Sequence, residues 1–545
     1  MIRFRYTYAL KVLLIQPPIE DFYDTSIRTY PLSLLYIATK IRDICHVSIE
    51  DFRSNRKSRK IDDCHFPELA SYYRSDRYTP LSLFRRYSRY GANHDEIRQK
   101  IASEKPDVVA VSSLFSAYSE EAIDVARCAK EVSEDIMTVL GGVHPTLFPE
   151  HALESPFVDY VVRGEGETPF FQLIEVLKTG KRQGVVDIKG VASKDTSGYV
   201  IPNIHIEEDL DTSPDRTLLN PSAYCIGKKN YTFFLTSRGC PFHCAFCGRP
   251  PFPYRVRNLG SIEKEIKECL SLDIQAIDFE DDMLTLDRVR FHSILNLFKE
   301  TGLTLSAMNG IYSDNLDIPT LEHMYRAGFR RLNFSLVDAS ALITDQQKRH
   351  NGENFTNLLP YLEASDFFVE THFIIGLPSQ QVEHILDTII FLMGKRLLLG
   401  PSIFYLAPNS EAYHQFVANH KDTAAQFKLM RSSAMVPVNP NLPRDSLYTL
   451  MKLVRFVNLV KRLLDGPDAP RRLSDILEMP SITKNDRDKT ILATLLNEKR
   501  LIWFDGSRGD FVPEPHNSDL IRLFLDHTKN KSIRGFKTMN QLVVD

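Results

Sequence analysis

The sequence predicts an α/β protein in three parts: a doubly wound parallel sheet, a partial (β/α)6 barrel, and a small helical C-terminal region with a winged-helix-like unit. Short apolar runs, typical of parallel strands covered on both faces, alternate with segments of helical apolar spacing through most of the chain. Its 545 residues leave room for about three or four structural units. Repeated strand–helix units predict parallel sheets with ligands at the carboxyl ends of the strands.

The composition is that of an ordinary globular protein. Hydrophobic residues make up 43% and charged residues 25% of the chain, which argues against wholesale disorder. A net charge of −3 gives no global field for nucleic acid or an acidic membrane, and no apolar run is long enough to span a bilayer. The apolar start runs into Pro17 and Pro18 without a signal-peptide cleavage site, so we expect a cytoplasmic protein without a nucleic acid partner.

The first unit is expected over residues 1–182. A charged and aromatic stretch at 51–90 has little periodicity, and we interpret it as an irregular insertion. The predicted strands are Lys11–Gln16, 47–50, 107–112, 137–140 and 159–162, and the predicted helices are 31–41, 120–132 and 169–177.

A polar, Asp-rich and Pro-containing stretch at 183–227 is predicted to be a linker. The barrel is expected over 228–420 and the helical region over 421–545, with a helix at 443–464 and, after a helix at 486–498, a hairpin. The predicted barrel strands are 231–236, Ala276–Phe279, 304–308, 331–335, 370–375 and 402–406, and the helices between them are 261–272, 287–301, Ile318–Ala327, 356–364 and Val382–Met393.

Three of the eight cysteines form a C-x3-C-x2-C array, at Cys240, Cys244 and Cys247, directly after an apolar predicted strand. With His243 they could form a structural zinc site, because zinc takes four donors. The alternative is an iron–sulfur cluster, whose usual ligands are cysteine thiolates. We favour the cluster, because the array lies at the functional rim of the predicted barrel and three protein ligands leave one metal position open.

This array, on the loop after the first barrel strand, resembles that of the radical S-adenosylmethionine (SAM) superfamily. The resemblance implies that Cys240, Cys244 and Cys247 bind a 4Fe-4S cluster whose fourth iron binds SAM. It implies that an electron from the cluster cleaves SAM to methionine and a 5′-deoxyadenosyl radical. It also implies that the backbone of Phe246 meets the adenine.

Residues after the later barrel strands resemble the same superfamily. Its common G-I-E-S sequence is replaced by Ser335-Leu336-Val337-Asp338, so that valine stands where a glutamate is frequent. The resemblance implies that SAM is bound by Glu280 and Asp281 after the second strand, Asn309 after the third, Ser335 at the end of the fourth, Gly376 and Pro378 after the fifth, and the turn 408–410 after the sixth.

The first unit resembles Rossmann-like cobalamin-binding domains. Ser112-Ser113-Leu114 and Gly141-Gly142 match their S-x-L…G-G signature, in which a hydroxyl and glycine backbone approach the nucleotide tail. No D-x-H-x-x-G follows the first strand, so we expect cobalt without a protein histidine below it, and His144 to order its loop. The segments 141–146 and 162–168 resemble the cobalamin-binding radical SAM subgroup, which makes the candidate cofactor-binding residues Ser112, Leu114, Gly141, Gly142, His144, Gly164 and Glu165.

These resemblances imply a cobalamin-dependent radical SAM enzyme, with methyltransferase as the first choice. One SAM would methylate cobalamin, and a second would give the radical that activates a carbon of an organic substrate, a small molecule or a peptide. An electron donor such as flavodoxin or ferredoxin would reduce the cluster. Two alternatives stay open: a cyclase or ring-rearranging enzyme like the anaerobic porphyrin-ester cyclases, and a non-catalytic iron–sulfur and cobalamin sensor. The sequence identifies no substrate and no general base.

Overall fold

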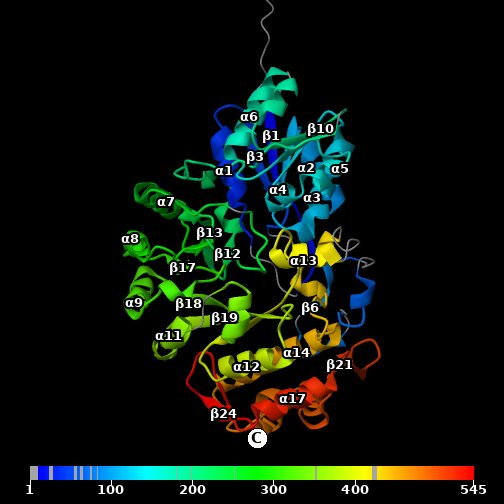
Figure 1. Ribbon diagram of the computed structural model, residues 1–545, viewed down its shortest axis with the longest axis vertical. Helices are drawn as coiled ribbons and strands as arrows, with labels where there is room; N and C mark the ends of the chain where they lie inside the picture. The colour runs from blue at the N-terminus through cyan, green and yellow to red at the C-terminus, as the bar shows by residue number, and fades with distance from the viewer. Residues whose placement is uncertain are drawn as a thin grey trace, which may run out of the picture.

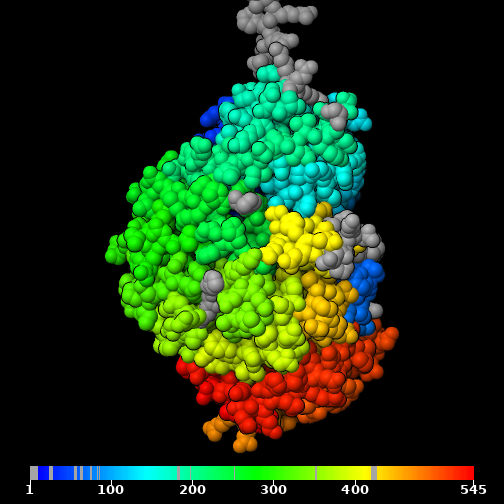
Figure 2. Space-filling model, viewed as in Figure 1, coloured from blue at the N-terminus to red at the C-terminus, as the bar shows by residue number. Residues whose placement is uncertain are grey.

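The computed structural model describes residues 10–23, 29–54, 58–61, 66–73, 77–82, 84–180, 182–196, 198–250, 252–349, 353–419 and 426–545. In Figure 1 the N-terminal sheet and its helices lie at the top, the barrel (green) lies below it on the left, and the C-terminal elements (orange and red) lie at the bottom. Figure 2 shows α13 (Glu411–Asn419, yellow) against the N-terminal unit and the barrel. No helix in the described ranges is long and apolar enough to cross a membrane.

A seven-stranded sheet with the order β11-β10-β9-β8-β7-β1-β3 forms the N-terminal unit. Its parallel strands follow the flavodoxin-like order, and the connections reverse direction between β1 and β7. Helices α2 and α3 cover one face and α1 and α6 the other, so the doubly wound prediction is confirmed. The strands are β1 (Lys11–Gln16), β3 (His46–Asp51), β7 (Val108–Ser112), β8 (Met137–Gly141), β9 (Tyr160–Val162), β10 (Val191–Asp195) and β11 (Gly198–Val200), and the helices are α1 (Leu32–Ile41), α2 (His94–Glu104), α3 (Ser119–Val132), α4 (Val143–Leu147), α5 (Pro149–Glu154) and α6 (Glu167–Thr179).

The predicted linker at 183–227 is wrong in part. It contains β10 and β11, which add an antiparallel edge to the N-terminal sheet, with Val191 opposite Val162. Val191 and Ala192 are buried there. These two strands could not be recognised from the sequence. Edge strands are short and carry polar residues on their outer side, so their composition resembles that of a loop.

The stretch 51–90 is not wholly irregular. β6 (Phe84–Tyr90) pairs with β2 (Ile19–Tyr23) and β4 (Ser58–Lys60) in a small antiparallel sheet, while β5 (Arg77–Tyr78) pairs with a C-terminal strand. A sequence without periodicity folds here because aromatic rings pack on one another. The rings in contact are those of Phe22, Phe66, Tyr73 and Tyr87.

Six parallel strands in the order β13-β16-β17-β18-β19-β20 form the barrel, and the partial-barrel prediction is confirmed. Isolated bridges from Leu305 to Phe329 and from Ile311 to Phe334 join its two three-stranded halves. β12 adds an antiparallel edge. The strands are β12 (Cys225–Ile226), β13 (Lys229–Phe234), β16 (Ala276–Phe279), β17 (Thr304–Ser306), β18 (Arg331–Val337), β19 (Phe368–Ile375) and β20 (Leu398–Ile403), and the helices are α7 (Leu259–Ser271), α8 (Arg288–Phe298), α9 (Ile318–Ala327), α10 (Ala341–Gln346), α11 (Glu353–Ala364) and α12 (Val382–Met393).

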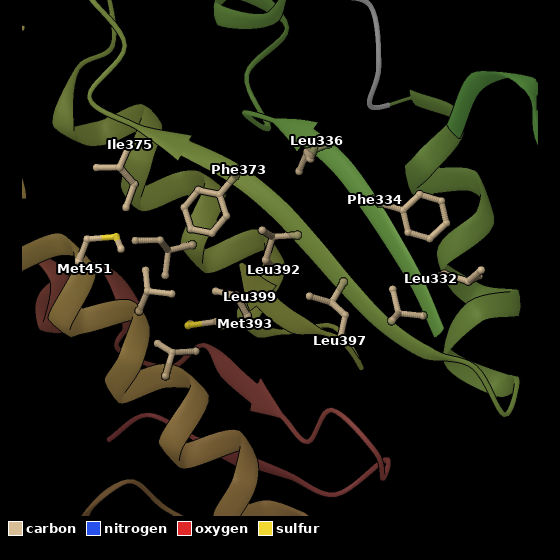
Figure 3. Close-up of a cluster of buried hydrophobic side chains, with 14 of the residues drawn as sticks. Leu332, Phe334, Leu336, Phe373, Ile375, Leu392, Met393, Leu397, Leu399 and Met451 are labelled. Atoms are coloured by element: carbon tan, nitrogen blue, oxygen red, sulfur yellow. The ribbon is translucent and has the colours of Figure 1, made fainter. Parts of the chain in front are cut away.

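The last barrel strand begins at Leu398, before the predicted range of 402–406. Gly400 and Pro401 disfavour strand structure, so the sequence did not indicate that the strand begins before them. Proline is tolerated at this position because β20 is an edge strand. Figure 3 shows the core beside it, where Phe373 of β19 and Met451 of a C-terminal helix belong to one apolar cluster.

The C-terminal region is built on the 21-residue helix α14 (Arg444–Leu464), which packs against β20. The predicted helix and hairpin are confirmed, and β5 joins the hairpin as a third strand through Tyr78 and Phe504. The other elements are α15 (Pro480–Thr483), α16 (Asp486–Ala493), a π-helix (Thr494–Glu498), β21 (Ile502–Asp505), β22 (Asp510–Pro513), α17 (Ser518–Thr528), β23 (Ser532–Arg534) and β24 (Gln541–Val543).

A buried ion pair joins β2 to the segment that precedes the C-terminal helix α14. Arg431 and Asp21 lie 3.3 Å apart, with side chains 4% and 1% exposed. Arg431 Nη1 also donates to the Glu20 carbonyl (2.6 Å), and the Asp21 carboxylate accepts hydrogen bonds from Tyr118 and Ser433 (2.6 Å each). These further hydrogen bonds offset part of the desolvation cost of the buried charges.

We expect the Arg431→Ala variant to lose about 3 kcal/mol of stability, because Asp21 is left buried without its cation. Calorimetry should show a fall in Tm of about 3 °C. Arg462→Ala, at an exposed position of α14, is the matched control and should leave the Tm unchanged. Equal Tm values for the two variants would contradict a stabilising role of the pair.

Candidate functional site

A short strand pair closes the base of the cysteine loop. β14 (Ser237–Arg238) and β15 (Arg255–Val256) pair antiparallel, so the loop leaves and returns just beyond the carboxyl end of β13. Cys240, Cys244 and Cys247 lie on this loop as half-buried free thiols. All three cysteines therefore lie on one loop at the carboxyl edge of the barrel.

Two glycines let the cysteine loop approach its neighbours more closely than a side chain allows. A Cβ on Gly239 (φ +84°) would lie 2.2 Å from the Pro253 carbonyl oxygen. A Cβ on Gly248 would lie 2.0 Å from the carbonyl oxygen of Pro408. The loop is thus pressed against the turn after β20, which is one of the segments expected to bind SAM.

Burial raises the pKa of the Cys240 and Cys244 thiols, so binding of a metal must supply the energy of their deprotonation. The charge of Arg349 opposes this rise at Cys244. The sequence did not identify Arg349 as a residue of this site. Its position after the fourth strand is the feature that could have indicated it. Among the residues described, no three His, Cys, Asp or Glu side chains are grouped so as to hold a metal ion.

Asp281 lies beneath the cysteine loop. Its carboxylate accepts hydrogen bonds from the Thr236 N–H (3.0 Å) and hydroxyl (2.7 Å) and from the Ser237 hydroxyl (2.6 Å). Burial raises the pKa of this carboxyl, although the hydrogen bonds oppose the rise. Its contacts therefore support a role in positioning the loop, in contrast to the expected contact with SAM.

Three of the residues expected to bind SAM lie on neighbouring strands. Asn309 Nδ2 donates to Glu280 Oε2 (2.8 Å) and to the Glu280 carbonyl (3.1 Å). A Cβ on Gly310 would lie 3.4 Å from that of Ser335, which places Ser335 beside the loop after β17. Polar groups from the ends of β16, β17 and β18 are therefore brought to one edge of the barrel.

Val337, where the family often has glutamate, is held in a strained conformation. It has φ +70° at a bulge in the β18–β19 pairing, a rare conformation for a β-branched residue. Its side chain is buried in an apolar cluster with Leu377, and Phe246 packs against this cluster. The valine offers no hydrogen bond to a ribose, and such strain is typical of functional sites.

Asp338 helps to hold the segment after β19. Its buried carboxylate accepts a hydrogen bond from Gln380 Nε2 (2.6 Å), and Gln380 Oε1 accepts one from the Gly376 N–H (2.7 Å). Gly376 is buried with φ +96°, whereas Pro378 is exposed. The conformation of Gly376 is therefore fixed by a network that begins at the strained end of β18.

The signature segments of the N-terminal sheet lie side by side at its carboxyl edge. Ser112 pairs with Gly141 in the β7–β8 register, and the half-buried Leu114 follows two residues later. A Cβ on Gly142 (φ +117°) would lie 2.6 Å from the Ser113 carbonyl oxygen. Because only glycine permits this approach, the two motifs belong to one structural unit.

Two buried polar atoms lie where the strand order reverses. Gln16 ends β1 and Ser113 follows β7, and both residues are 3% exposed. Within the described parts of the chain, neither Gln16 Nε2 nor Ser113 Oγ has a hydrogen-bond partner. Buried polar groups are normally paired, so these atoms favour a polar ligand at this point. The nearby Phe115 is 58% exposed, which is unusual for such a large apolar residue.

His144 is enclosed by protein. Its Nδ1 lies 2.9 Å from Ser116 Oγ, and its Nε2 lies 3.0 Å from His151 Nδ1. The Phe427 ring packs on it, with ring centroids 4.8 Å apart. Burial lowers the pKa of His144 to about 3, so the ring is neutral at pH 7. These contacts agree with the predicted role in ordering the loop.

Gly164 and Glu165 contact other parts of the protein. A Cβ on Gly164 would lie 2.1 Å from the His205 carbonyl oxygen. The Glu165 carboxylate binds Arg238 and Arg255, which stand on either side of the cysteine loop. Burial alone would raise the pKa of Glu165, but the hydrogen bond from Arg255 and the two positive charges outweigh it and lower the pKa. Both residues thus lie at contacts within the protein, although a cofactor contact was expected.

Two family models match the chain: the B12 binding domain over residues 86–174 and the radical SAM superfamily over residues 234–392. An uncharacterised methyltransferase of Pyrococcus horikoshii is 27% identical over 76% of this chain and 84% of its own length. The anaerobic magnesium-protoporphyrin IX monomethyl ester cyclase of Rubrivivax gelatinosus is 29% identical over 59% of this chain and 60% of its own length.

A solved structure has a similar fold. It is the radical SAM methyltransferase TsrM of Kitasatospora setae, with cobalamin and a 4Fe-4S cluster bound. The alignment covers 82% of this chain and 91% of that one, with a TM-score of 0.59 and 14% sequence identity.

The fold, the cysteine loop and the two family matches define a radical SAM enzyme with a B12-binding domain. The chain thus combines a B12 binding domain with a radical SAM domain, and these two domains imply cobalamin, a 4Fe-4S cluster and SAM as its cofactors. Its residues fit these groups: three thiols lie on one loop, polar groups line the adjacent barrel edge, and buried polar atoms lie at the reversal point of the N-terminal sheet.

We expect Asp281→Asn to lower the iron bound after anaerobic reconstitution at least about two-fold, because the amide cannot accept all the hydrogen bonds from the loop base. Iron and sulfide per chain measure the effect. Asp273→Asn, at an exposed turn, is the control and should bind a full cluster. A full cluster in Asp281→Asn would show that the loop base does not need this carboxylate.

We expect the stability of the protein to fall below about pH 6.5 partly through His144. The unfolded state binds a proton near pH 6.5, whereas the buried ring resists protonation down to about pH 3, so acid favours unfolding between these values. His144→Gln should remove about 1 kcal/mol of the loss between pH 7.5 and 5.5. The exposed-site control His46→Gln should keep the wild-type dependence of Tm on pH. Equal pH dependence in His144→Gln and the wild type would contradict this assignment.

Proposed function

We propose that the chain is a C-methyltransferase that moves a methyl group from SAM, by way of cobalamin, to an unactivated carbon. The proposal is carried by the contact between the two carboxyl edges: Glu165, after β9, binds Arg255 beside the cysteine loop, and Phe148, after β8, packs on Tyr413, after β20. Both cofactor sites would then open into one junction, as transfer between them requires. The methyltransferase relative also matches 76% of the chain, against 59% for the cyclase relative.

In the proposed barrel site, the chain holds and orients two of the cofactors. Asp281 keeps the base of the cysteine loop in place, and Arg349 favours the thiolate of Cys244. When bound, the cluster and SAM supply a carbon radical, and cobalamin supplies a methyl carrier. The proposed ligands are Cys240, Cys244 and Cys247 for the cluster and Phe246, Glu280, Asn309, Ser335, Gly376 and Pro378 for SAM.

In the proposed cobalamin site, Ser112, Leu114, Gly141 and Gly142 form a backbone cradle. The buried side chains of Gln16 and Ser113 complete their hydrogen bonds with the polar groups of the cofactor. Both nitrogens of His144 are engaged within the protein, so this side chain would not be free to bind the cobalt of a bound cobalamin. The proposed domains are 1–182, 228–420 and 421–545, with 183–200 completing the first sheet.

The proposed partners follow from the chemistry. The substrate is an organic small molecule or peptide, and a flavodoxin or ferredoxin delivers the electron to the cluster. A net charge of −3 favours neither nucleic acid nor another polyanion. The described cysteines are free thiols, which suits a reducing cytoplasm.

An assay of SAM consumption without the organic substrate distinguishes the methyltransferase, the cyclase and the sensor. The reconstituted protein, with reduced cobalamin bound, is incubated anaerobically with SAM and with dithionite as the electron donor to the cluster, and S-adenosylhomocysteine and 5′-deoxyadenosine are quantified. A methyltransferase forms about one S-adenosylhomocysteine per cobalamin, because the methyl group leaves SAM for cobalt. A cyclase forms 5′-deoxyadenosine without S-adenosylhomocysteine, and that result would overturn the proposal. An intact cluster with neither product would favour the sensor.

The variant with Cys240, Cys244 and Cys247 all replaced by alanine should lose its iron and form no 5′-deoxyadenosine, because the cluster has no thiolate ligands left. Iron analysis and product quantification measure both effects. Cys225→Ala removes an exposed thiol outside the loop and should retain both properties. SAM cleavage by the triple variant would exclude these cysteines as the cluster ligands.

A further inference from the structure

Four charged side chains meet where the N-terminal sheet touches the cysteine loop. Arg255 forms two hydrogen bonds with Glu165, from Nη1 to Oε2 (2.7 Å) and from Nη2 to Oε1 (2.9 Å). Arg238 donates to Glu165 Oε1 (3.2 Å) and to Glu167 Oε1 (2.7 Å). The four side chains are only 9–18% exposed, so solvent screens these pairs weakly.

The two arginines stand at the two ends of the cysteine loop. Arg238 lies in β14, two residues before Cys240, and Arg255 lies opposite it in β15. The two glutamates belong to the N-terminal sheet: Glu165 follows β9, and Glu167 is the first residue of α6. The ion pairs therefore connect the base of the cysteine loop directly to the carboxyl edge of the other sheet.

Each side of this contact is itself held in place. Glu207 N–H donates to Glu165 Oε2 (2.6 Å), and the Glu207 carbonyl accepts from Arg255 Nη1 (2.5 Å). The Glu207 carboxylate accepts hydrogen bonds from the N–H and the hydroxyl of Thr168. The Arg238 guanidinium lies 4.9 Å from the ring centre of Tyr36 in α1. The charged groups thus meet in a fixed geometry.

Directional contacts of this kind determine position more than they add stability. An apolar contact of the same area could slide, whereas a two-fold hydrogen-bonded arginine–carboxylate pair fixes both distance and orientation. A buried ion pair often adds little net stability compared with an apolar contact, so its positional role is the stronger explanation. A cluster and a cobalt that work on one substrate need such a fixed separation.

We propose that Glu165, Glu167, Arg238 and Arg255 form an inter-domain clamp that sets the separation between the cluster loop and cobalamin. These are positioning residues. The clamp requires that both cofactors bind, but it does not depend on whether the chain transfers a methyl group or catalyses a cyclisation.

The test measures the separation by pulsed electron paramagnetic resonance. A nitroxide is attached to the exposed Cys225 in β12, with Cys64, which lies outside the described residues, replaced by serine. The second spin is cob(II)alamin, and the holoenzyme is kept with its cluster oxidised and diamagnetic. The intact clamp should give one narrow distance distribution.

The Glu165→Gln/Glu167→Gln variant should broaden the distance distribution about two-fold or shift its centre, because the apolar contacts that remain between α1 and the barrel fix orientation less strictly than the ion pairs. Glu175→Gln removes an exposed ion pair elsewhere on α6 and should keep the narrow distribution. Iron, cobalamin absorbance and Tm show that each variant is folded and loaded. If the double variant does not load, Arg255→Lys, which keeps the charge but loses the two-fold hydrogen bonding, is measured in its place. An unchanged distribution in the loaded variant would overturn the clamp.

Discussion

Two parallel sheets can share one reaction site only when the loops at their carboxyl ends face each other, and in this chain charge-assisted hydrogen bonds hold them in that relation. Each sheet has its own core, and a further apolar cluster, in which Leu35 of α1 lies with Tyr231 and Ala276 of the barrel, joins the two. Glu165 binds Arg255 on one side of the junction, and His144 packs on Phe427 on another. The cofactor sites depend on this arrangement because neither sheet carries both.

The parts of the fold that the sequence predicts well are those determined locally. Lys11–Gln16 has the predicted bounds because residues 12–15 form a continuous apolar run, as a strand buried on both faces requires. The three cysteines could be recognised because their spacing is short. The function of Glu165 could not, since it depends on Arg238 and Arg255, which are 73 and 90 residues away and form no local pattern with it.

Several departures from ordinary sequence rules occur close to the proposed SAM site. Val337 is a β-branched residue with positive φ, and Asp338 is a buried carboxylate bound to neutral donors. Neither feature is expected in an idealised barrel. Here the hydrogen bonds through Gln380 connect this end of β18 to Gly376. Conflicts between local preference and global fold are expected at functional sites, where the surrounding structure must hold what the local sequence disfavours.

The pairing of β5 with β21 has a consequence for biosynthesis. Arg77 and Tyr78 leave the ribosome long before Phe504 and Asp505 have been translated, so the nascent chain must carry an unpaired strand until β21 emerges. The N-terminal sheet, whose contacts are closer in sequence, is able to form first. Chaperone dependence should therefore concentrate on β5, which stays unpaired until β21 has been synthesised.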